Sequence, residues 1–342
     1  MWEVMERGGV VSLLENSLKN NRLPNAYLVC GPEHVGKMTL ALDIARALNC
    51  NQPNAPCGQC PTCHKISTGK HPDIMVFDLL SARMKEKDRD RENRVKEIGV
   101  EVVDDIIHFS SLPPYEGRYR VMIVDDAEQL SPEAANRLLK TLEEPEERVI
   151  YILLTVSEKL VLPTIASRCQ KLELRPLPVG DVEKYLINRG VPLERAHLLA
   201  HLSRGCLGWA LNAAADEFVL EERKERLDTI LSIITAGIGT RFEYAARLAG
   251  RFGDDHRAVM EELDFWTTWW RDILLVKSDA RDHVTNIDYL PTLSELAAGY
   301  SLTQIRSFIG KLQDAVSQLK LNASPRLVLE VLMLHIPGRN IK

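Results

Sequence analysis

The sequence predicts an α/β domain built on a parallel sheet, followed by an entirely helical region. Up to about residue 176, short apolar runs alternate with segments of helical spacing. Apolar runs of this kind are typical of strands in a parallel sheet that helices cover on both faces. From about residue 179 the strand signals disappear, and apolar residues recur at helical intervals. A chain of 342 residues is too long for one simple core, so two or three domains are expected.

In the α/β region, a helix over residues 11–21 is expected first, and Pro24 separates it from the first strand. Strands are expected at 26–30, 73–77, 118–126, 149–156 and 171–176. Helices are expected between them at 37–49, 60–69, 99–110, 131–144 and 163–169. The helix over 131–144 has the clearest ends, because Ser131 suits the N-cap, Pro132 suits the first turn and Pro145 prevents continuation.

In the helical region, a small bundle is expected from helices near 179–189, 192–203 and 207–215. A longer helical segment follows from about 219 to 337. Within it, Trp266, Trp269 and Trp270 recur on one helix face, a pattern that indicates core packing rather than a ligand site. The last helix begins at Ser324–Pro325 and is apolar on more than one face. We therefore expect it to pack on two sides, with a neighbouring subunit as a candidate for the second.

Composition and charge limit the classes of function. The formal net charge of −5 argues against a surface that coats nucleic acid by bulk electrostatics. The first residues lack a basic region before an apolar core, and no apolar run approaches the roughly 18 residues of a membrane span. A cytoplasmic protein without membrane contact is expected. The densely charged segment 83–97 is interpreted as a surface loop, with transient contact to DNA or a partner as the alternative.

The first strand leads directly into a loop with the outline of a phosphate-binding P-loop. Four residues separate Gly31 from Gly36, and Lys37 follows. Glycines let backbone amides surround phosphates, and the lysine ammonium reaches their terminal oxygens. The next residue should carry a hydroxyl for Mg²⁺, but it is Met38, and Thr39 comes one position late. Because a thioether is a poor ligand for this cation, the sequence predicts a nucleotide site that has lost part of its chemistry.

Four of the seven cysteines lie close together, at Cys50, Cys57, Cys60 and Cys63. Overlapping C-x-x-C steps with Pro, Gly and Asn between them can aim four sulfurs at one point, as tetrahedral Zn²⁺ requires. A structural zinc site is favoured over a disulfide, a redox pair or an iron–sulfur cluster. The adjacent His64 is an alternative ligand, although we expect it to be solvated. The other cysteines are expected to be small buried hydrophobic residues: Cys30, Cys169 and Cys206.

Polar residues follow two of the later strands. Asp125 and Asp126 end the strand over 118–126. We expect this strand to lie beside the first one, so that Asp125 faces the phosphates and holds a metal-bound water. Asp126 is shorter than the glutamate that normally orients the attacking water, so efficient hydrolysis is not expected; simple solvation of both acids is the alternative. Thr155 and Ser157 either sense the phosphate state or cap a turn.

Arg168 lies in the Ser-Arg-Cys sequence that closes the helix over 163–169. Two interpretations are compatible with this position. An arginine at the C-terminus of a helix interacts favourably with the helix dipole. In a multisubunit ATPase, an arginine can also reach into a neighbouring site and stabilise transition-state charge.

Four motifs occur together in this chain: GPEHVGK, the four-cysteine insert, NRLLKTLEEPEE (136–147) and PTIASRCQ (163–170). Together they resemble the bacterial DNA polymerase III clamp-loader AAA+ family, and the ending NASPRLVLEVLMLHI resembles its collar domain. The resemblance covers almost the entire chain. It implies a P-loop AAA+ domain with a zinc-binding insert over 1–178, a small helical lid over 179–216 and an all-α collar for oligomerisation over 217–342.

At three positions this chain differs from the gamma/tau motor subunits of the family, and in these differences it resembles the delta-prime branch. Motor subunits carry a hydroxyl where this chain has Met38, and Asp-Glu where it has Asp125-Asp126. Gly208 stands where their small domain has an arginine that senses the γ-phosphate. The resemblance therefore implies no intrinsic ATPase and weak or absent ATP or ADP binding. Arg168 would serve in trans the ATP of an adjacent motor subunit.

The implied partners are the gamma/tau and delta subunits in a hetero-oligomeric, pentameric ring. Through this complex, within the DNA polymerase III holoenzyme, the chain would act on the sliding clamp and on primer-template DNA during replication. Two alternatives remain open. One is an ATP-hydrolysing gamma/tau-type motor, and the other is a DNA-binding AAA+ initiator or helicase-loading factor, for which the acidic net charge offers little support.

Overall fold

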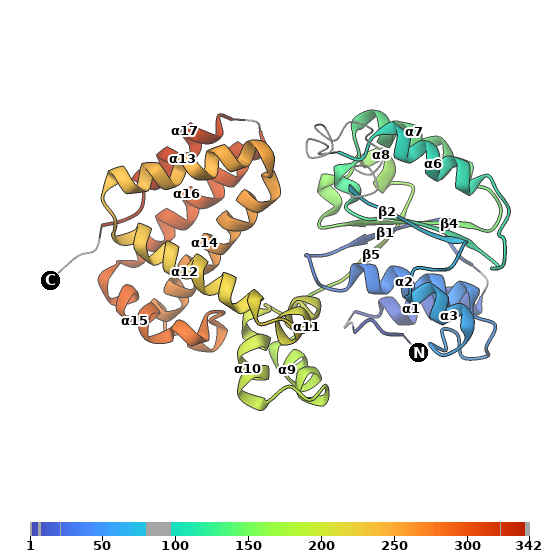
Figure 1. The fold of residues 1–342 in the computed structure, drawn as a ribbon, viewed down its shortest axis with the longest axis horizontal. Coiled ribbons are helices and arrows are strands. Elements are labelled where there is room, and N and C mark those ends of the chain that lie inside the picture. The colour runs from blue at the N-terminus through green and yellow to red at the C-terminus, as the bar shows by residue number, and fades with distance from the viewer. Residues whose placement is uncertain (1, 6–7, 21, 80–96, 322, 339–342) are drawn as a thin grey trace. The chain divides into compact units, whose positions relative to one another are not determined.

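The computed structural model describes residues 2–5, 8–20, 22–79, 97–321 and 323–338 (Figure 1). Apart from Glu97, the charged segment 83–97 lies outside the described residues. The chain divides into two compact units. The first consists of Met1–Pro178 with Gly205–Trp209, and the second of Val179–Arg204 with Ala210–Lys342.

The first unit is built on a five-stranded parallel sheet in the order β2-β3-β4-β1-β5. The strands are β1 (Ala26–Cys30), β2 (Ile74–Phe77), β3 (Arg120–Val124), β4 (Val149–Thr155) and β5 (Gln170–Glu173). All residues of β1, β3 and β4 are buried. The parallel sheet predicted from these apolar runs is confirmed.

The expected position of β3 beside β1 is wrong, because β4 lies between them and pairs with both. In register, Tyr151 of β4 is opposite Ala26 of β1 and Met122 of β3. All seven residues of β4 are buried. β4 is thus the central strand of the sheet, with both of its edges paired to parallel strands.

Helices cover both faces of the sheet (Figure 1). One face carries α1 (Val10–Lys19), α2 (Lys37–Asn49) and α3 (Pro61–Ser67), whose apolar residues join one core cluster. The other carries α6 (Val100–Ser110), α7 (Pro132–Glu143) and α8 (Pro163–Ala166), which join a second cluster. Ser131 caps α7 through a bond from the amide of Ala134, as its sequence predicts. Short 3₁₀ turns follow β3 and β4, at Ala127–Gln129 and Glu158–Leu160.

Two buried aspartates fix segments that bound the sheet. Oδ2 of Asp43 in α2 accepts hydrogen bonds from the amides of Glu3 and Val4, both at 2.8 Å, and thereby holds the N-terminal segment. Asp73, just before β2, accepts from the amides of residues 115, 116 and 117 and from Arg120. Burial opposes the charged form of Asp73, but these donors outweigh it and lower its pKa.

The second unit is entirely helical within the residues that the structure describes. Its helices are α9 (Val179–Asn188), α10 (Leu193–Leu202), most of α11 (Leu207–Ala215), α12 (Phe218–Thr235), α13 (Ile238–Asp254), α14 (His256–Lys277), α15 (Leu290–Gly299), α16 (Leu302–Lys320) and α17 (Pro325–Leu334), with 3₁₀ turns at Arg281–His283 and Ile287–Tyr289. Trp266, Trp269 and Trp270 of α14 are fully buried, so the predicted core role of this stripe is confirmed. The Trp270 ring lies 4.7 Å from that of Phe308 and 5.3 Å from that of Tyr300.

Helix α17 is covered on one side and exposed on the other. It packs mainly against α13 and α16, and Val328, Leu329, Leu332 and Met333 are buried. Its other face exposes three large apolar residues at helical spacing: Leu327, Val331 and Leu334. Within this chain, the helix therefore packs on one of the two sides that its sequence predicts.

Candidate functional site

The P-loop connects β1 to α2 and is closed on itself by its own lysine. Lys37 is buried, and its Nζ donates hydrogen bonds to the carbonyls of Gly31 (2.9 Å) and Pro32 (3.1 Å). A Cβ at Gly31 would lie only 2.6 Å from the Leu174 carbonyl oxygen, so the close approach of β5 requires glycine here. Gly36 begins α2 with a φ of 107°, which also favours glycine. A phosphate would have to displace the internal bonds of Lys37.

The segment Gly205–Trp209 lies against this loop and belongs to the same compact unit. The amide of Gly208 donates to the carbonyl of His34 at 2.9 Å, and His34 itself has a left-handed φ of 59°. A Cβ at position 208 would lie 2.8 Å from that same carbonyl oxygen. Position 208 therefore makes a close backbone contact with the P-loop that leaves no room for a side chain.

The residues after the lysine do not present a hydroxyl where the sequence pattern requires it. Met38 packs against the apolar core formed by α1, α2 and the sheet. Thr39 is half-buried one residue further along the helix, and its side chain is rotated by about 100° from that of Met38. The structure therefore keeps the backbone of a P-loop without its usual Mg²⁺ ligand.

Asp125 and Asp126 follow β3 at the edge of the sheet that carries the P-loop. Burial raises the pKa of Asp125, and the neighbouring Asp126 raises it further. The amide of Asp126 and the charge of Lys37 act in the opposite direction, so Asp125 interacts electrostatically with the P-loop lysine although β4 separates their strands. Parallel strands bring their carboxyl ends to the same edge, which explains this proximity.

Thr155 ends β4 opposite Cys30, the last residue of β1. Its hydroxyl donates to the carbonyl of Ser157 (3.1 Å) and accepts from the Ser157 amide (3.2 Å). The carbonyl of Thr155 also accepts from the Gly31 amide. The buried hydroxyl therefore caps the turn after β4, one of the two roles considered from the sequence.

Arg168 follows α8 at the surface, with 35% of its side chain exposed. Its guanidinium pairs with Glu143 at 2.5 Å and donates to the carbonyl of Thr164 at 2.8 Å. The bond to a helix carbonyl agrees with the helix-terminus interpretation. Sequence reasoning missed Glu143, although it belongs to the LEEP motif that carried the resemblance. The ion pair physically connects this motif to Ser-Arg-Cys.

Cys50, Cys57, Cys60 and Cys63 converge, and their sulfur atoms all lie within 4.8 Å of one another. The Cys50–Cys60 and Cys57–Cys63 sulfur pairs are both separated by 3.9 Å. Four thiolates about 2.3 Å from a tetrahedral Zn²⁺ would be about 3.8 Å apart, so the cluster fits this ion. The amides of Gln59 and Cys60 lower the pKa of the Cys57 thiol to about 6, whereas burial raises the pKa of the Cys63 thiol to about 12. The fit to a metal therefore depends on the positions of the four sulfurs.

His64 and the other three cysteines do not belong to the four-cysteine cluster. His64 is exposed and does not join the four sulfurs. Cys30 is buried as expected, whereas Cys169 and Cys206 are only half-buried, which corrects the expectation for these two. Cys169 still packs against the core below α7 and α8, and burial raises the pKa of its thiol to about 12.

Comparison with known proteins places the chain in a family. The family described as DNA polymerase III, delta subunit, matches residues 7–178, just over half of the chain. The chain belongs to this DNA polymerase III subunit family. The resemblance to the clamp-loader AAA+ proteins that was drawn from the motifs is therefore confirmed.

Relatives within this family differ in how much of their length they share with the chain. The chain is 27% identical to Bacillus subtilis DNA polymerase III subunit delta' over 95% of this chain and 94% of that protein. It is 33% identical to the Escherichia coli tau subunit over 54% of this chain, but spans only 27% of that protein. A solved structure of a gamma subunit-related protein from Thermotoga maritima is 16% identical to this chain, with a TM-score of 0.44. The alignment covers 94% of this chain and 98% of that protein. In the described part of the chain, no helix combines the length and the apolar composition of a membrane span.

Proposed function

We propose that this chain acts as the delta-prime-type, non-motor subunit of a DNA polymerase III clamp loader. The observation that carries this proposal is Met38, which packs into the apolar core and offers no hydroxyl where the P-loop pattern requires one. The amide of Gly208 also donates to the carbonyl of His34 in the P-loop. The missing hydroxyl at Met38 removes a Mg²⁺ ligand that phosphoryl transfer requires. The end-to-end similarity to subunit delta' supports the same assignment. Binding of ATP or ADP in this pocket is weak or absent.

Arg168 has the properties of a group that acts on a neighbouring subunit. Its exposed guanidinium is held by Glu143 and Thr164 rather than by the chain's own P-loop. In the assembled loader it would lie against the ATP of an adjacent gamma/tau subunit and stabilise charge on the transferred phosphoryl group. An arginine of this kind is worth about 10³–10⁵ in the rate of hydrolysis at its site.

The test is the ATPase rate of a reconstituted loader that carries Arg168→Ala, measured with sliding clamp and primer-template DNA. We expect a marked fall in the stimulated rate. Arg175→Ala is the matched control, because Arg175 is a more exposed arginine of the same unit, and it should leave the rate unchanged. A wild-type rate with Arg168→Ala would remove the proposed role.

The motor alternative has its own measurement, since tau subunits are also among the relatives. The purified chain should show no appreciable ATP turnover. Turnover that disappears with Lys37→Ala would favour a motor subunit instead. Salt-sensitive binding of the isolated chain to DNA would favour the third alternative, a DNA-binding AAA+ initiator.

We propose Zn²⁺ as the ion held by Cys50, Cys57, Cys60 and Cys63. With four protein ligands the site has no open position, so the ion would be structural and would fix the loop between α2 and α3. Elemental analysis of protein purified without chelator should find about one zinc per chain. Cys60→Ser should reduce this content, whereas Cys206→Ser should retain it.

The remaining assignments concern assembly. We propose that the gamma/tau and delta subunits form a pentameric ring with this chain, and that the ring brings it to the sliding clamp and to primer-template DNA in the cytoplasm. Residues 179–216 would be the lid and residues 217–342 the collar. The exposed stripe Leu327, Val331 and Leu334 supports a collar contact, because such a row of apolar side chains is suited to a neighbouring helix. Native mass measurement of the mixed subunits tests the stoichiometry.

A further inference from the structure

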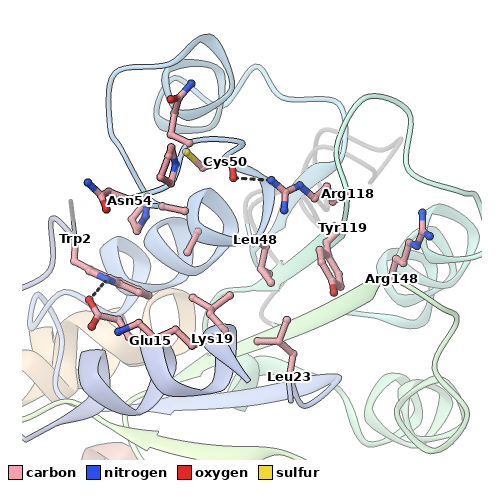
Figure 2. A pocket seen from close by; sticks show the side chains of 16 residues that line it. Trp2, Glu15, Lys19, Leu23, Leu48, Cys50, Asn54, Arg118, Tyr119 and Arg148 are labelled. Carbon is pink, nitrogen blue, oxygen red and sulfur yellow. Dashed lines mark hydrogen bonds between the residues drawn. The ribbon is translucent and has the colours of Figure 1, made fainter. Parts of the chain in front are cut away.

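A cavity of about 960 Å³ lies in the first unit, between α1, the loop that follows Cys50 and the segment that enters β3 (Figure 2). None of the P-loop residues 31–37 lines it. We propose that this cavity binds a peptide segment of a partner protein in which acidic residues flank an apolar side chain. The proposal is independent of the nucleotide site and of Arg168.

The charge of the cavity is positive, although the chain as a whole is acidic. Lys19, Arg118 and Arg148 line it, and Glu15 is its one acidic lining residue. Lys19 and Arg148 are exposed, and neither has an ion-pair partner among the residues that the structure describes. Among the described residues, Arg118 is bonded only to neutral oxygens, those of the Cys50 carbonyl (3.0 Å) and the Asn51 side chain (2.6 Å). All three cations are therefore available to carboxylates.

The floor of the cavity is apolar. Leu48 is buried there, and Trp2, Leu18, Leu23 and Tyr119 are half-buried against the core below. A hollow that combines an apolar floor with polar and charged groups suits the side chains of a peptide. A DNA backbone presents phosphates and sugars, which a flat basic surface binds without such a floor. The combination therefore favours a peptide over nucleic acid.

Both walls of the cavity are fixed before any ligand binds. On one side, the amides of Glu3 and Val4 are held by Asp43, and the indole of Trp2 donates to Glu15 at 3.1 Å. On the other side, Figure 2 shows Arg118 bonded to the carbonyl of Cys50, which also contributes a sulfur to the four-cysteine cluster. A preformed site avoids part of the entropy cost of ordering side chains on binding.

The experiment measures fluorescence anisotropy of a fluorescein-labelled peptide, with alternating Asp and Leu residues, titrated with the full-length chain at low salt. The double variant Lys19→Glu/Arg148→Glu should bind roughly tenfold more weakly, because each reversal replaces an attraction by a repulsion. Lys159→Glu is the control: Lys159 is an exposed cation of the same unit that does not line the cavity. It should bind like the wild type. Circular dichroism checks that all variants are folded.

Two further probes separate this binding from general charge attraction. A peptide with Ser in place of every Leu should bind more weakly than the Asp-Leu probe, because the apolar floor loses its ligand. A DNA duplex should not compete with the Asp-Leu probe. The proposal is overturned by absent binding, by equal affinity for the two peptides, by an equal loss with Lys159→Glu, or by competition from DNA.

Discussion

Gly208→Ala tests the closed P-loop directly. A methyl group at this position would lie 2.8 Å from the backbone oxygen of His34, and that oxygen is fixed by the amide of Gly208 itself. Relief of the overlap requires a shift of the loop or of the segment at 205–209. Such overpacking typically costs about 1–3 kcal/mol, and loss of the hydrogen bond adds about 1 kcal/mol. We therefore expect the free energy of unfolding of the first unit to fall by about 1–3 kcal/mol after the gain in helix propensity, roughly 1 kcal/mol, is subtracted.

Differential scanning calorimetry is the assay, because it can resolve separate transitions of two compact units. Gly310→Ala is the matched control: Gly310 lies inside α16, and a Cβ there would meet no atom within 4 Å. Both substitutions gain the same helix propensity, so the control should stabilise by up to about 1 kcal/mol while Gly208→Ala destabilises. If both variants shifted stability in the same direction, the contact between Gly208 and His34 would not close the P-loop as inferred.

Three further predictions concern stability. Asp73→Asn should lower the free energy of unfolding by about 3–5 kcal/mol at neutral pH, because it leaves Arg120 without its buried partner. Folding lowers the pKa of Asp73, so the stabilisation by its carboxylate is present above the ordinary Asp pKa of about 3.9 and is lost as pH falls through the lower folded value. Urea titrations should therefore show a smaller difference in stability between variant and wild type near pH 3. Equal differences at both values would contradict this. Trp270→Ala should cost about 3–5 kcal/mol in the second unit, measured by chemical denaturation, because the indole is fully buried against Phe308; a cost below about 1 kcal/mol would refute the core role. Chelation of the proposed zinc should lower the calorimetric transition of the first unit alone, and a shift of both transitions would contradict a local structural site.

The sequence predicted most elements of the fold because their signals are local. Apolar runs such as 149–156 and the caps at Ser131 and Pro145 depend on residues within one or two turns. The C-x-x-C spacing likewise limits where four sulfurs can point, and the structure brings them together. The exposure of Cys169 and Cys206 was mispredicted, because burial of a single residue depends on what packs over it rather than on its neighbours in sequence.

Local signals did not determine which segments become neighbours. β4 follows β3 in the chain but lies between β3 and β1 in the sheet. The same limitation concealed the ion pair of Arg168, which follows α8, with Glu143, which ends α7.

The sequence by itself determined that this protein has a parallel α/β unit, a helical region with a tryptophan core, a four-cysteine cluster and a P-loop without its Mg²⁺ hydroxyl. Only the tertiary structure decided that Lys37 and Gly208 close this loop, and that α1, the cysteine loop and the entry to β3 form one basic cavity. The physical reason is that periodicity and capping act over a few residues. Contacts between distant segments depend on how their apolar faces compete for the same core.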